Sequence, residues 1–185
     1  AAIIPWNMPA IIFAWKVGAA LACGNPVLAK PSATAPLTVQ ALGNALHEAG
    51  IPTDVLQIIT GNGGETGRAL VDEPLVRHVS FTGSTATGRE VGASAGRNLK
   101  RVHLELGGND AFIVTKSADV KRAAAAAVRH RFYNCGQVCT SAKRILVHES
   151  CEDTFVAHAK DLIEQIQVGN GLLGSKMGPL NNKDQ

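Results

Sequence analysis

The stretch AAIIPWNMPAIIFAWKVGAALACGNPVLAK, residues 1–30, predicts the fold of the first half of the chain. The apolar run from Ala1 to Trp6 indicates a buried strand. Pro9 suits the first turn of a helix, which we expect to run to about Cys23, because a glycine follows there. Val27 to Lys30 then predicts a second strand. A strand, a helix and a strand in this order form the repeating unit of parallel sheets.

The same alternation continues along the chain and predicts a mostly parallel α/β sheet. Further elements are expected as a helix from Pro36 to Gly50, strands at Val55–Ile59, Arg77–Phe81 and Arg101–Leu106, and a helix after GSTATG that ends near Gly96. The loop TGNGGETG is expected to lead into a short helix. The regular alternation ends near Glu105, which predicts one domain over residues 1–104 and another over residues 105–185.

The second half of the chain does not continue this regular alternation of strands and helices. Its predicted elements are a strand at Ala111–Val114, a helix at Val120–Phe132, a Cys-rich loop, a strand near Ile145–His148 and a helix from Ser150 to about Ile166. The last 18 residues are rich in turn residues, and we expect no regular element there.

Composition excludes several classes of protein. A length of 185 residues fits one domain or slightly more, and 45% hydrophobic with 18% charged residues is ordinary globular composition. The net charge of +3 is spread thinly, so we expect no nucleic-acid partner. Residues 1–29 carry one charge, Lys16, but three prolines and Asn25 interrupt any apolar span of about 20 residues, so we expect no membrane helix.

The cysteines predict a reducing compartment. Cys23, Cys135, Cys139 and Cys151 are too few and too irregularly spaced for a disulfide framework, and no CxxC pair suggests a metal site. We therefore expect a cytoplasmic protein. Cys23 and Cys151 are interpreted as packing residues.

Three features are candidates for chemistry. Gly83 and Gly88 in GSTATG follow a predicted strand and precede a helix, as in a turn that cradles phosphate, although tight packing explains two glycines equally well. Cys139 lies in the polar loop NCGQVCTSAKR, where a thiolate nucleophile is reachable, but a free cysteine is more often a buried apolar residue. Cys135 is interpreted as structural, or as a thiol that traps an oxidised Cys139.

Glu105 is the candidate general base. It ends the strand HLEL, and a carboxylate buried between Leu104 and Leu106 would have a raised pKa, whereas a side chain at a strand end can also simply reach solvent. His130 is interpreted as an exposed helical residue rather than as the partner of a Cys/His hydrolase. Arg129 and Arg131 could pair with a substrate carboxylate, but solvation is the preferred interpretation.

Five motifs together resemble the aldehyde dehydrogenase superfamily in their order and spacing. They are PWN at Pro5–Asn7, AKPS at Ala29–Ser32, FTGST at Phe81–Thr85, ELGG at Glu105–Gly108 and GQVC at Gly136–Cys139. GGNDAFIV and YNCGQVC further resemble the succinate semialdehyde dehydrogenase branch. The resemblance implies a Rossmann-like parallel-sheet cofactor domain, incomplete here, followed by the start of an α/β catalytic domain. It also implies that the chain is an internal fragment of a protein well over twice as long.

The resemblance assigns catalytic roles to three residues. Cys139 would attack the aldehyde to form a thiohemiacetal, and the Asn7 amide with the Cys139 N–H would bind the oxyanion. Hydride transfer to NAD or NADP would leave a thioester, which Glu105 would hydrolyse as general base. The full-length parent is expected to be a homodimer or homotetramer acting on a small aldehyde.

The resemblance also places the cofactor. Trp6 and Asn7 would lie beside the nicotinamide half, and the backbone of Leu106 would contact the nicotinamide. The other implied contacts are Lys30 and Ser32 at the adenosine ribose, and Gly83 and Ser84 at the pyrophosphate. Relatives that prefer NAD often carry Glu after KPS, and Ala33 stands there instead. Because Ala33 removes a charge that would repel a 2′-phosphate, we expect NADP to be accepted.

Two other classes of function stay open. One is a nucleotide-binding or structural member of the fold without turnover, which intact Cys139, Glu105 and Asn7 argue against. The other is a thiol-dependent hydrolase or acyltransferase, which would process substrate without reducing a nicotinamide.

Overall fold

The computed structural model describes residues 1–183 and 185. Its contacts divide the chain into two compact units, Ala1–Gly107 and Gly108–Gln185, and each is described by itself. The boundary lies between the two glycines of the ELGG motif, three residues beyond the position near which the sequence predicts it.

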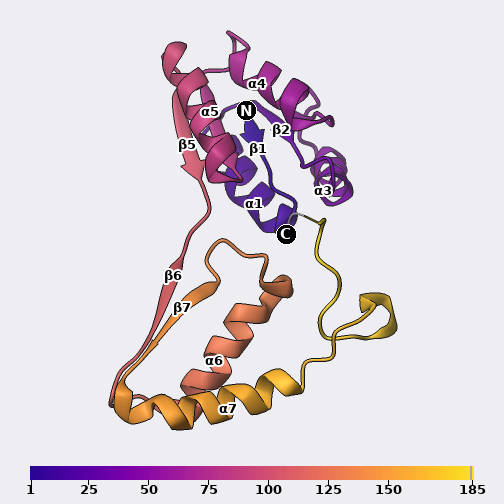
Figure 1. Ribbon diagram of the computed structural model, residues 1–185. Helices are drawn as coiled ribbons and strands as arrows, with labels where there is room; N and C mark the ends of the chain where they lie inside the picture. The colour runs from indigo at the N-terminus through magenta and orange to yellow at the C-terminus, as the bar shows by residue number, and fades with distance from the viewer. Residues whose placement is uncertain (184) are drawn as a thin grey trace. The chain divides into compact units, whose positions relative to one another are not determined.

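The first unit is built on a five-stranded parallel sheet with the strand order β3-β2-β1-β4-β5 (Figure 1). In chain order the strands are β1 (Ala2–Ile3), β2 (Val27–Lys30), β3 (Leu56–Ile58), β4 (His78–Thr82) and β5 (Arg101–Glu105). The predicted parallel α/β sheet is therefore confirmed. The strands are shorter than the apolar runs that encode them; β1 covers two residues of the predicted Ala1–Trp6, because Pro5 lacks the N–H that a ladder needs.

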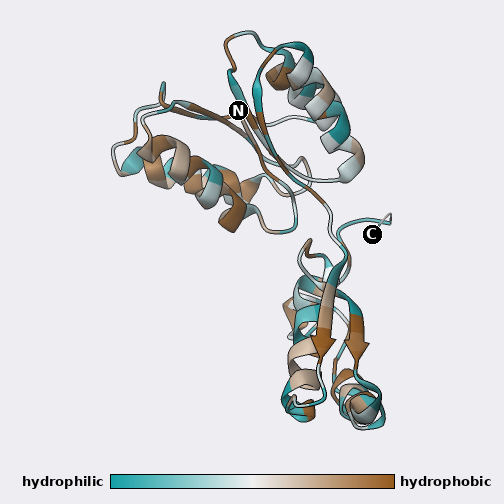
Figure 2. Ribbon diagram, turned by 90° about the vertical axis from the view of Figure 1, so that its left-hand side faces the viewer, coloured by the Kyte–Doolittle hydropathy of each residue, from teal (hydrophilic) through white to brown (hydrophobic). Residues whose placement is uncertain are grey.

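Helices cover both faces of this sheet (Figure 2). They are α1 (Pro9–Phe13), the π-helical turn η1 (Ala14–Gly18), α2 (Ala19–Ala22), α3 (Leu37–Glu48), the π-helical turn η2 (Gly63–Gly67), α4 (Arg68–Asp72) and α5 (Thr85–Arg97). On one face Phe13, Val17 and Val39 pack into a core with Ile4 and Leu56.

On the opposite face Val71 of α4 and Val91 of α5 pack with Val79 and Phe81 of β4. In β4 these two buried residues alternate with His78, Ser80 and Thr82, so this strand shows period-two alternation and not a continuous apolar run.

One loop differs from its prediction. TGNGGETG is not a plain loop, because its residues Gly63–Gly67 form η2. The Asn62 side chain accepts a hydrogen bond from the Glu65 N–H at 2.7 Å, which caps the first turn and starts the helix early.

The second unit is smaller. It contains the parallel strand pair β6 (Asp110–Val114) and β7 (Ala142–Val147), with α6 (Val120–Phe132), η3 (Tyr133–Gly136), η4 (Glu149–Cys151), α7 (Glu152–Glu164) and η5 (Gly171–Leu173). Val114 of β6, Ala124 and Ala127 of α6, and Phe155 of α7 share one core.

The C-terminal residues hold more structure than predicted. Val168 bridges Met177, and η5 is capped by the Asn170 side chain, which accepts from the Leu172 N–H at 3.0 Å. Local side-chain capping of this kind leaves no apolar periodicity in the sequence, which is why the pattern did not indicate it.

Gly43 marks a close approach of α3 to β3 and gives a test of the packing. A Cβ at this buried position would lie 2.6 Å from Ile58 Cγ1, and a β-branched side chain has little freedom to move away. We expect Gly43→Ala to lower the free energy of unfolding by about 1 kcal/mol or more, because overpacking costs about 1–3 kcal/mol. The measurement is urea unfolding of the full-length protein.

Gly96 is the matched control on α5. It is exposed, and no atom lies within 4 Å of an added Cβ, so Gly96→Ala should be neutral or raise stability by up to about 1 kcal/mol through helix propensity. Equal stabilisation by both substitutions would show that α3 does not pack on β3 as described.

Candidate active site

In the sheet of the first unit, ligands are expected at the carboxyl edge, where the carboxyl ends of the parallel strands lie. All five strands are parallel, and the strand order reverses direction between β1 and β4. In open α/β sheets the crevice outside the carboxyl ends of the strands, at such a reversal, is the usual ligand site.

The cofactor residues implied by the resemblance follow the carboxyl ends of four strands of this sheet. Trp6 and Asn7 follow β1, Lys30 ends β2 and is followed by Ser32 and Ala33, Gly83 and Ser84 follow β4, and Leu106 follows β5. The fold of the first unit thus brings these eight residues to one edge. Trp6, Asn7 and Ser32 are half-buried, whereas Ala33 and Ser84 are exposed.

Lys30 is a buried cation. It is 3% exposed, and its Nζ donates to the Pro31 carbonyl at 3.1 Å. Burial lowers the pKa of Lys30 from its ordinary value. No salt bridge with Lys30 occurs among the described residues. A buried ammonium without a carboxylate partner favours an anionic or hydroxyl-rich ligand beside it.

The turn after β4 presents the N-terminus of α5. Ser84 caps this helix, because its Oγ accepts from the Thr87 N–H at 3.1 Å. The Gly83 N–H donates to the Glu105 carbonyl at 3.1 Å, which ties the turn to the end of β5. Gly88 is buried, and a Cβ there would lie 2.4 Å from Leu106 Cδ2, so this glycine lets α5 approach the end of β5. Both glycines therefore have a packing role, and the helix N-terminus beside them suits an anion.

Thr82, the last residue of β4, carries a polar atom with no visible partner. Its Oγ1 is buried and makes no hydrogen bond among the described residues. In register, Thr82 lies beside Glu105 of β5. Since buried hydroxyls are normally hydrogen-bonded, this position suits a ligand that supplies the missing partner.

Glu105 is more exposed than the sequence suggests. The expected burial between Leu104 and Leu106 is wrong, because its side chain is 60% exposed and lies at the end of the edge strand β5. Its Oε1 lies 3.0 Å from His103 Nε2. Edge strands lack a neighbour on one side, and the apolar flanking residues do not enclose the carboxylate between them.

Lys16 lies on the same face of the sheet as this carboxylate. Its Nζ donates to Ser80 Oγ at 2.7 Å, and Ser80 precedes Thr82 by two residues on β4. Burial lowers the pKa of Lys16 to about 8, and the charge of Glu105 opposes that shift. Lys16 and Glu105 are therefore close enough for their charges to interact.

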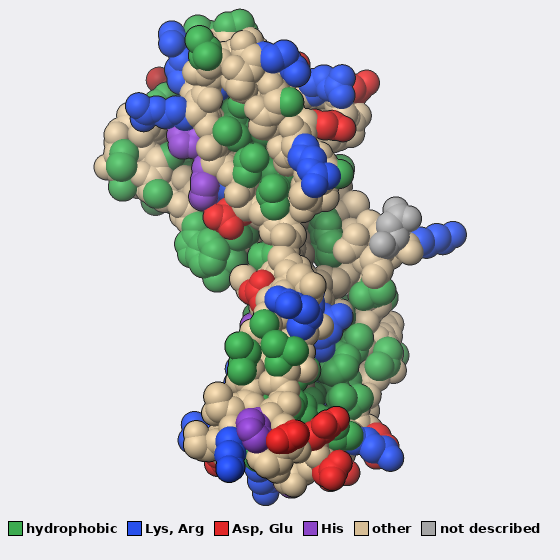
Figure 3. Space-filling model, turned by 60° about the vertical axis from the view of Figure 1, so that its left-hand side comes forward, with side chains coloured by type: hydrophobic (Ala, Val, Ile, Leu, Met, Phe, Trp, Pro, Cys, Tyr) green, Lys and Arg blue, Asp and Glu red, His purple; other side chains and the backbone are tan. Residues whose placement is uncertain are grey.

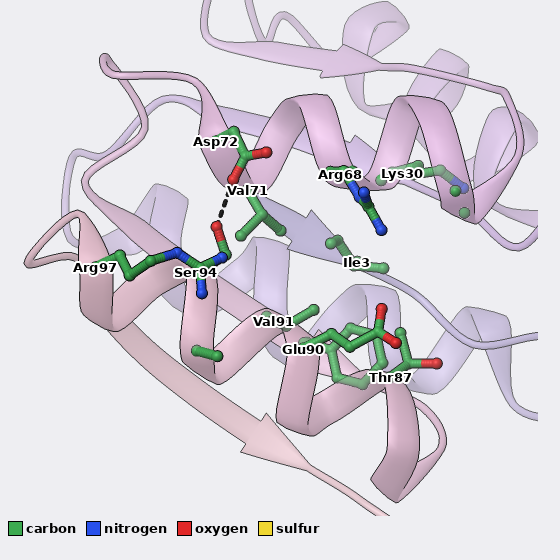
Figure 4. Close-up of a pocket in the computed structure, with 15 residues that line it drawn as sticks. Ile3, Lys30, Arg68, Val71, Asp72, Thr87, Glu90, Val91, Ser94 and Arg97 are labelled. Carbon is green, nitrogen blue, oxygen red and sulfur yellow. Dashed lines mark hydrogen bonds between the residues drawn. The ribbon is translucent and has the colours of Figure 1, made fainter.

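A cavity of about 610 Å³ lies on the opposite face of the sheet, between η2–α4 and α5. This volume is in the range of small-molecule sites. Figure 4 shows Lys30 and Arg68 toward one end of the cavity and Arg97 toward the other, where the Ser94 hydroxyl donates to Asp72. The floor is apolar and includes Ile3 and Val91.

Several lining residues were missed from the sequence. Arg68 and Glu90 lie in no motif, and Thr87 belongs to GSTATG but was not singled out there. The loop TGNGGETG was given no functional role, although its Gly63, Gly64 and Gly67 line the cavity. The strand order could have indicated them, because a loop after β3 and a helix after β4 both start at the carboxyl edge.

In the second unit, Cys139 is exposed, as expected for a nucleophile, and not the buried apolar residue of the alternative interpretation. It follows the turn η3, in which Asn134 and Cys135 have φ of 49° and 59° and Gly136 has φ of 75°. Non-glycine residues in the left-handed region carry strain that surrounding contacts must offset. Cys135 is half-buried, and its Sγ donates to the Gly178 carbonyl at 3.5 Å.

Two cations hold the loop that carries Cys139. Lys143 Nζ donates to the Cys139 carbonyl at 2.9 Å and to the Gly108 carbonyl at 2.6 Å. Arg131 Nη1 donates to Ser141 Oγ at 3.1 Å and to the Gly136 carbonyl at 3.4 Å. The solvated interpretation of Arg131 is therefore wrong, because Arg131 is half-buried and bound to the loop, whereas Arg129 is exposed.

The remaining candidates divide. Cys151 is buried as predicted, but Cys23 is exposed, because it lies at the end of α2 where the apolar face has ended. His130 is exposed on α6, as predicted.

Within the described residues no cluster of His, Cys, Asp or Glu is suited to hold a metal ion. Over the same residues, no helix combines the length and apolar character needed to cross a bilayer.

Known proteins match the chain along its whole length. Phenylacetaldehyde dehydrogenase of Pseudomonas fluorescens is 46% identical over 184 residues, which is 99% of this chain and 37% of that protein. The crystal structure of PnpE in complex with nicotinamide adenine dinucleotide superimposes with a TM-score of 0.94 at 37% identity, covering 98% of this chain and 37% of that one. Succinate-semialdehyde dehydrogenase from Burkholderia pseudomallei gives a TM-score of 0.94 at 39% identity, covering 99% of this chain and 38% of that one.

The chain thus spans less than two-fifths of the length of these relatives. The model of the Aldehyde dehydrogenase family matches residues 1–185. With that match and these identities, the chain belongs to the aldehyde dehydrogenase family.

Proposed function

We propose that this chain is part of an NAD(P)-dependent aldehyde dehydrogenase, with residues 1–104 in its cofactor domain and residues 105–185 at the start of its catalytic domain. The observation that carries the proposal is the family match over the whole chain, together with an exposed Cys139 and a polar carboxyl edge on the parallel sheet.

The residues present fit a dinucleotide. Thr82 Oγ1 lacks a partner, Lys30 is a buried cation on the cavity wall, and the capped N-terminus of α5 suits phosphate. Lys30 and Ser32 would hold the adenosine ribose, Gly83 and Ser84 the pyrophosphate, and Trp6, Asn7 and Leu106 the nicotinamide half. When bound, the nicotinamide supplies a two-electron oxidant that accepts hydride from the substrate carbon.

Cys139 would act as the nucleophile. Its thiolate would form a bond to the aldehyde carbon, and the carbonyl oxygen would become an alkoxide. The Asn7 side-chain amide and the Cys139 N–H would donate to this oxygen and stabilise the charge as it develops. Loss of hydride from the same carbon restores its carbonyl and leaves a thioester on Cys139.

Glu105 would complete the reaction as general base. It would take a proton from a water molecule, whose oxygen would attack the thioester carbon, and the Cys139 thiolate would leave with the bonding pair. The product is a carboxylic acid. The exposed side chain of Glu105 supports this role, because water can reach it.

We further propose a cytoplasmic protein that acts on a small aldehyde, with succinate semialdehyde as one candidate. Four free cysteines are in keeping with a reducing compartment. A homodimer or homotetramer is proposed for the full-length protein.

Two substitutions separate the steps of the mechanism. In the full-length protein, with phenylacetaldehyde or succinate semialdehyde, we expect Cys139→Ser to abolish cofactor reduction and to leave cofactor binding intact. Glu105→Gln should keep a first-turnover burst of reduced cofactor but slow the steady state by about 10²–10⁴-fold, because only hydrolysis of the thioester is affected. Stopped-flow absorbance of the reduced nicotinamide measures both.

Cys23→Ser is the control, since Cys23 is exposed and at the end of α2. Substantial turnover by Cys139→Ser would refute the assigned nucleophile. Turnover of substrate by the unmodified protein without cofactor reduction would instead favour a thiol hydrolase or acyltransferase.

Ala33 tests cofactor preference. A carboxylate about 4 Å from a 2′-phosphate costs about 4 kcal/mol per unit charge pair at an effective dielectric near 20 and about 1 kcal/mol in bulk water. Because Ala33 is exposed, we expect Ala33→Glu to lower kcat/KM for NADP relative to NAD by at least about tenfold.

Ala33→Gln is the matched control, because it adds the same length without the charge. An equal loss in both variants would assign the effect to size. Turnover by the unmodified protein with NAD and none with NADP would contradict the proposed acceptance of NADP.

A further inference from the structure

Glu105 has a close neighbour that the proposed mechanism does not use. His103 Nε2 lies 3.0 Å from Glu105 Oε1, which is a hydrogen-bonding distance. The two residues are separated by one position in β5, and alternate residues of a strand point to the same face. The strand geometry itself therefore places the imidazole beside the carboxylate.

The register of the sheet surrounds this pair with polar groups. Ser80 of β4 lies opposite His103, and Thr82 lies opposite Glu105. The charged and titratable groups around them are Lys16 on η1, His78 on β4 and Arg101 on β5. On the surface of the first unit, histidine side chains and a carboxylate lie next to one another (Figure 3).

The contact contributes little to stability. Both side chains are 60% exposed, and ion pairs or hydrogen bonds at such positions are weak because water competes for both partners. Its consequence is geometric. An exposed glutamate at the end of an edge strand has several rotamers available, and a hydrogen-bond donor beside one oxygen favours one of them.

We propose that His103 is a positioning residue for the Glu105 carboxylate in thioester hydrolysis, an inference that rests on the proposed function. The Nε2–H donates to Oε1 and leaves Oε2 to take the proton from water. The water oxygen then bonds to the thioester carbon, and the Cys139–carbon bond breaks with its electron pair on sulfur. His103 neither gains nor loses a proton in this step.

Two substitutions of His103 differ in whether they keep a hydrogen-bond donor beside Glu105. Glutamine carries an amide N–H near the position of the histidine Nε2–H, whereas alanine carries no donor. We expect His103→Ala to lower kcat in the full-length protein by about tenfold, because a misplaced base loses efficiency steeply with distance. We expect His103→Gln to retain most of kcat.

The decisive measurement compares the steps before and after hydride transfer. With phenylacetaldehyde or succinate semialdehyde and NAD or NADP, kcat/KM for the aldehyde and the amplitude of the first-turnover burst should be unchanged in His103→Ala, since the carboxylate acts after hydride transfer; the aldehyde KM should fall together with kcat. His78→Gln is the matched control, because His78 lies on the neighbouring strand in register with Arg101 and not with His103, and it should match the unmodified protein.

Three outcomes would overturn the inference. An unchanged kcat in His103→Ala would show that the contact does not position the base. Equal losses in His103→Ala and His103→Gln would show that the hydrogen bond is not what matters. Absence of cofactor reduction by the unmodified protein would overturn the proposed function and this inference with it, whereas normal turnover by that protein beside an unchanged His103→Ala would overturn the inference alone.

Discussion

The two-residue strand β1 is the constraint on which the first unit depends. Ala2 and Ile3 pair in parallel with Ala29 and Lys30 on one side and with Ser80 and Phe81 on the other. Within the described residues, β1 thus joins the β2–β3 half of the sheet to the β4–β5 half. The register fixed by these few hydrogen bonds aligns the carboxyl ends of the strands, so residues more than 100 positions apart in the sequence meet at one edge.

The alignment also separates two chemical environments. Phe81 and Ile3 point to the face covered by α4 and α5, where the cavity with Lys30 and Arg68 lies. Ser80 points to the other face, where it accepts from Lys16. Since side chains alternate along a strand, the sheet presents the cavity lined by Lys30 and Arg68 on one face and Glu105 with its basic neighbours on the other.

In the second unit, the loop that carries Cys139 is held by hydrogen bonds to backbone carbonyls. The consecutive left-handed residues Asn134 and Cys135 are costly by themselves, on the order of 1 kcal/mol each. Arg131 binds the Gly136 carbonyl and Lys143 binds the carbonyl of Cys139 itself, and these hydrogen bonds help to offset that cost. The Cys139 side chain is thus exposed on a loop whose backbone carbonyls are hydrogen-bonded to two basic side chains.

Sequence patterns predicted the order and kind of nearly all the elements, because apolar runs and helix periodicity record burial directly. Capped turns such as η2 were not predicted. The Asn62 side chain accepts a hydrogen bond from a backbone N–H three residues away, and such a local contact leaves no periodic signal in the sequence. Arg68 was missed, and solvation was wrongly preferred for Arg131, for a related reason: each is an ordinary helical arginine until the fold brings another segment beside it.

Glu105 shows the deeper limit of pattern-based inference. Apolar neighbours in sequence suggested burial, which would raise the pKa and make a base by desolvation. In β5 those neighbours alternate to the opposite face, so Glu105 meets water and two basic side chains, His103 and Lys16. The neighbours of this carboxylate are therefore set by the fold: His103 is two positions away on the same strand, Lys16 is 89 positions away on a helix, and the apolar flanks in the sequence indicate neither of them.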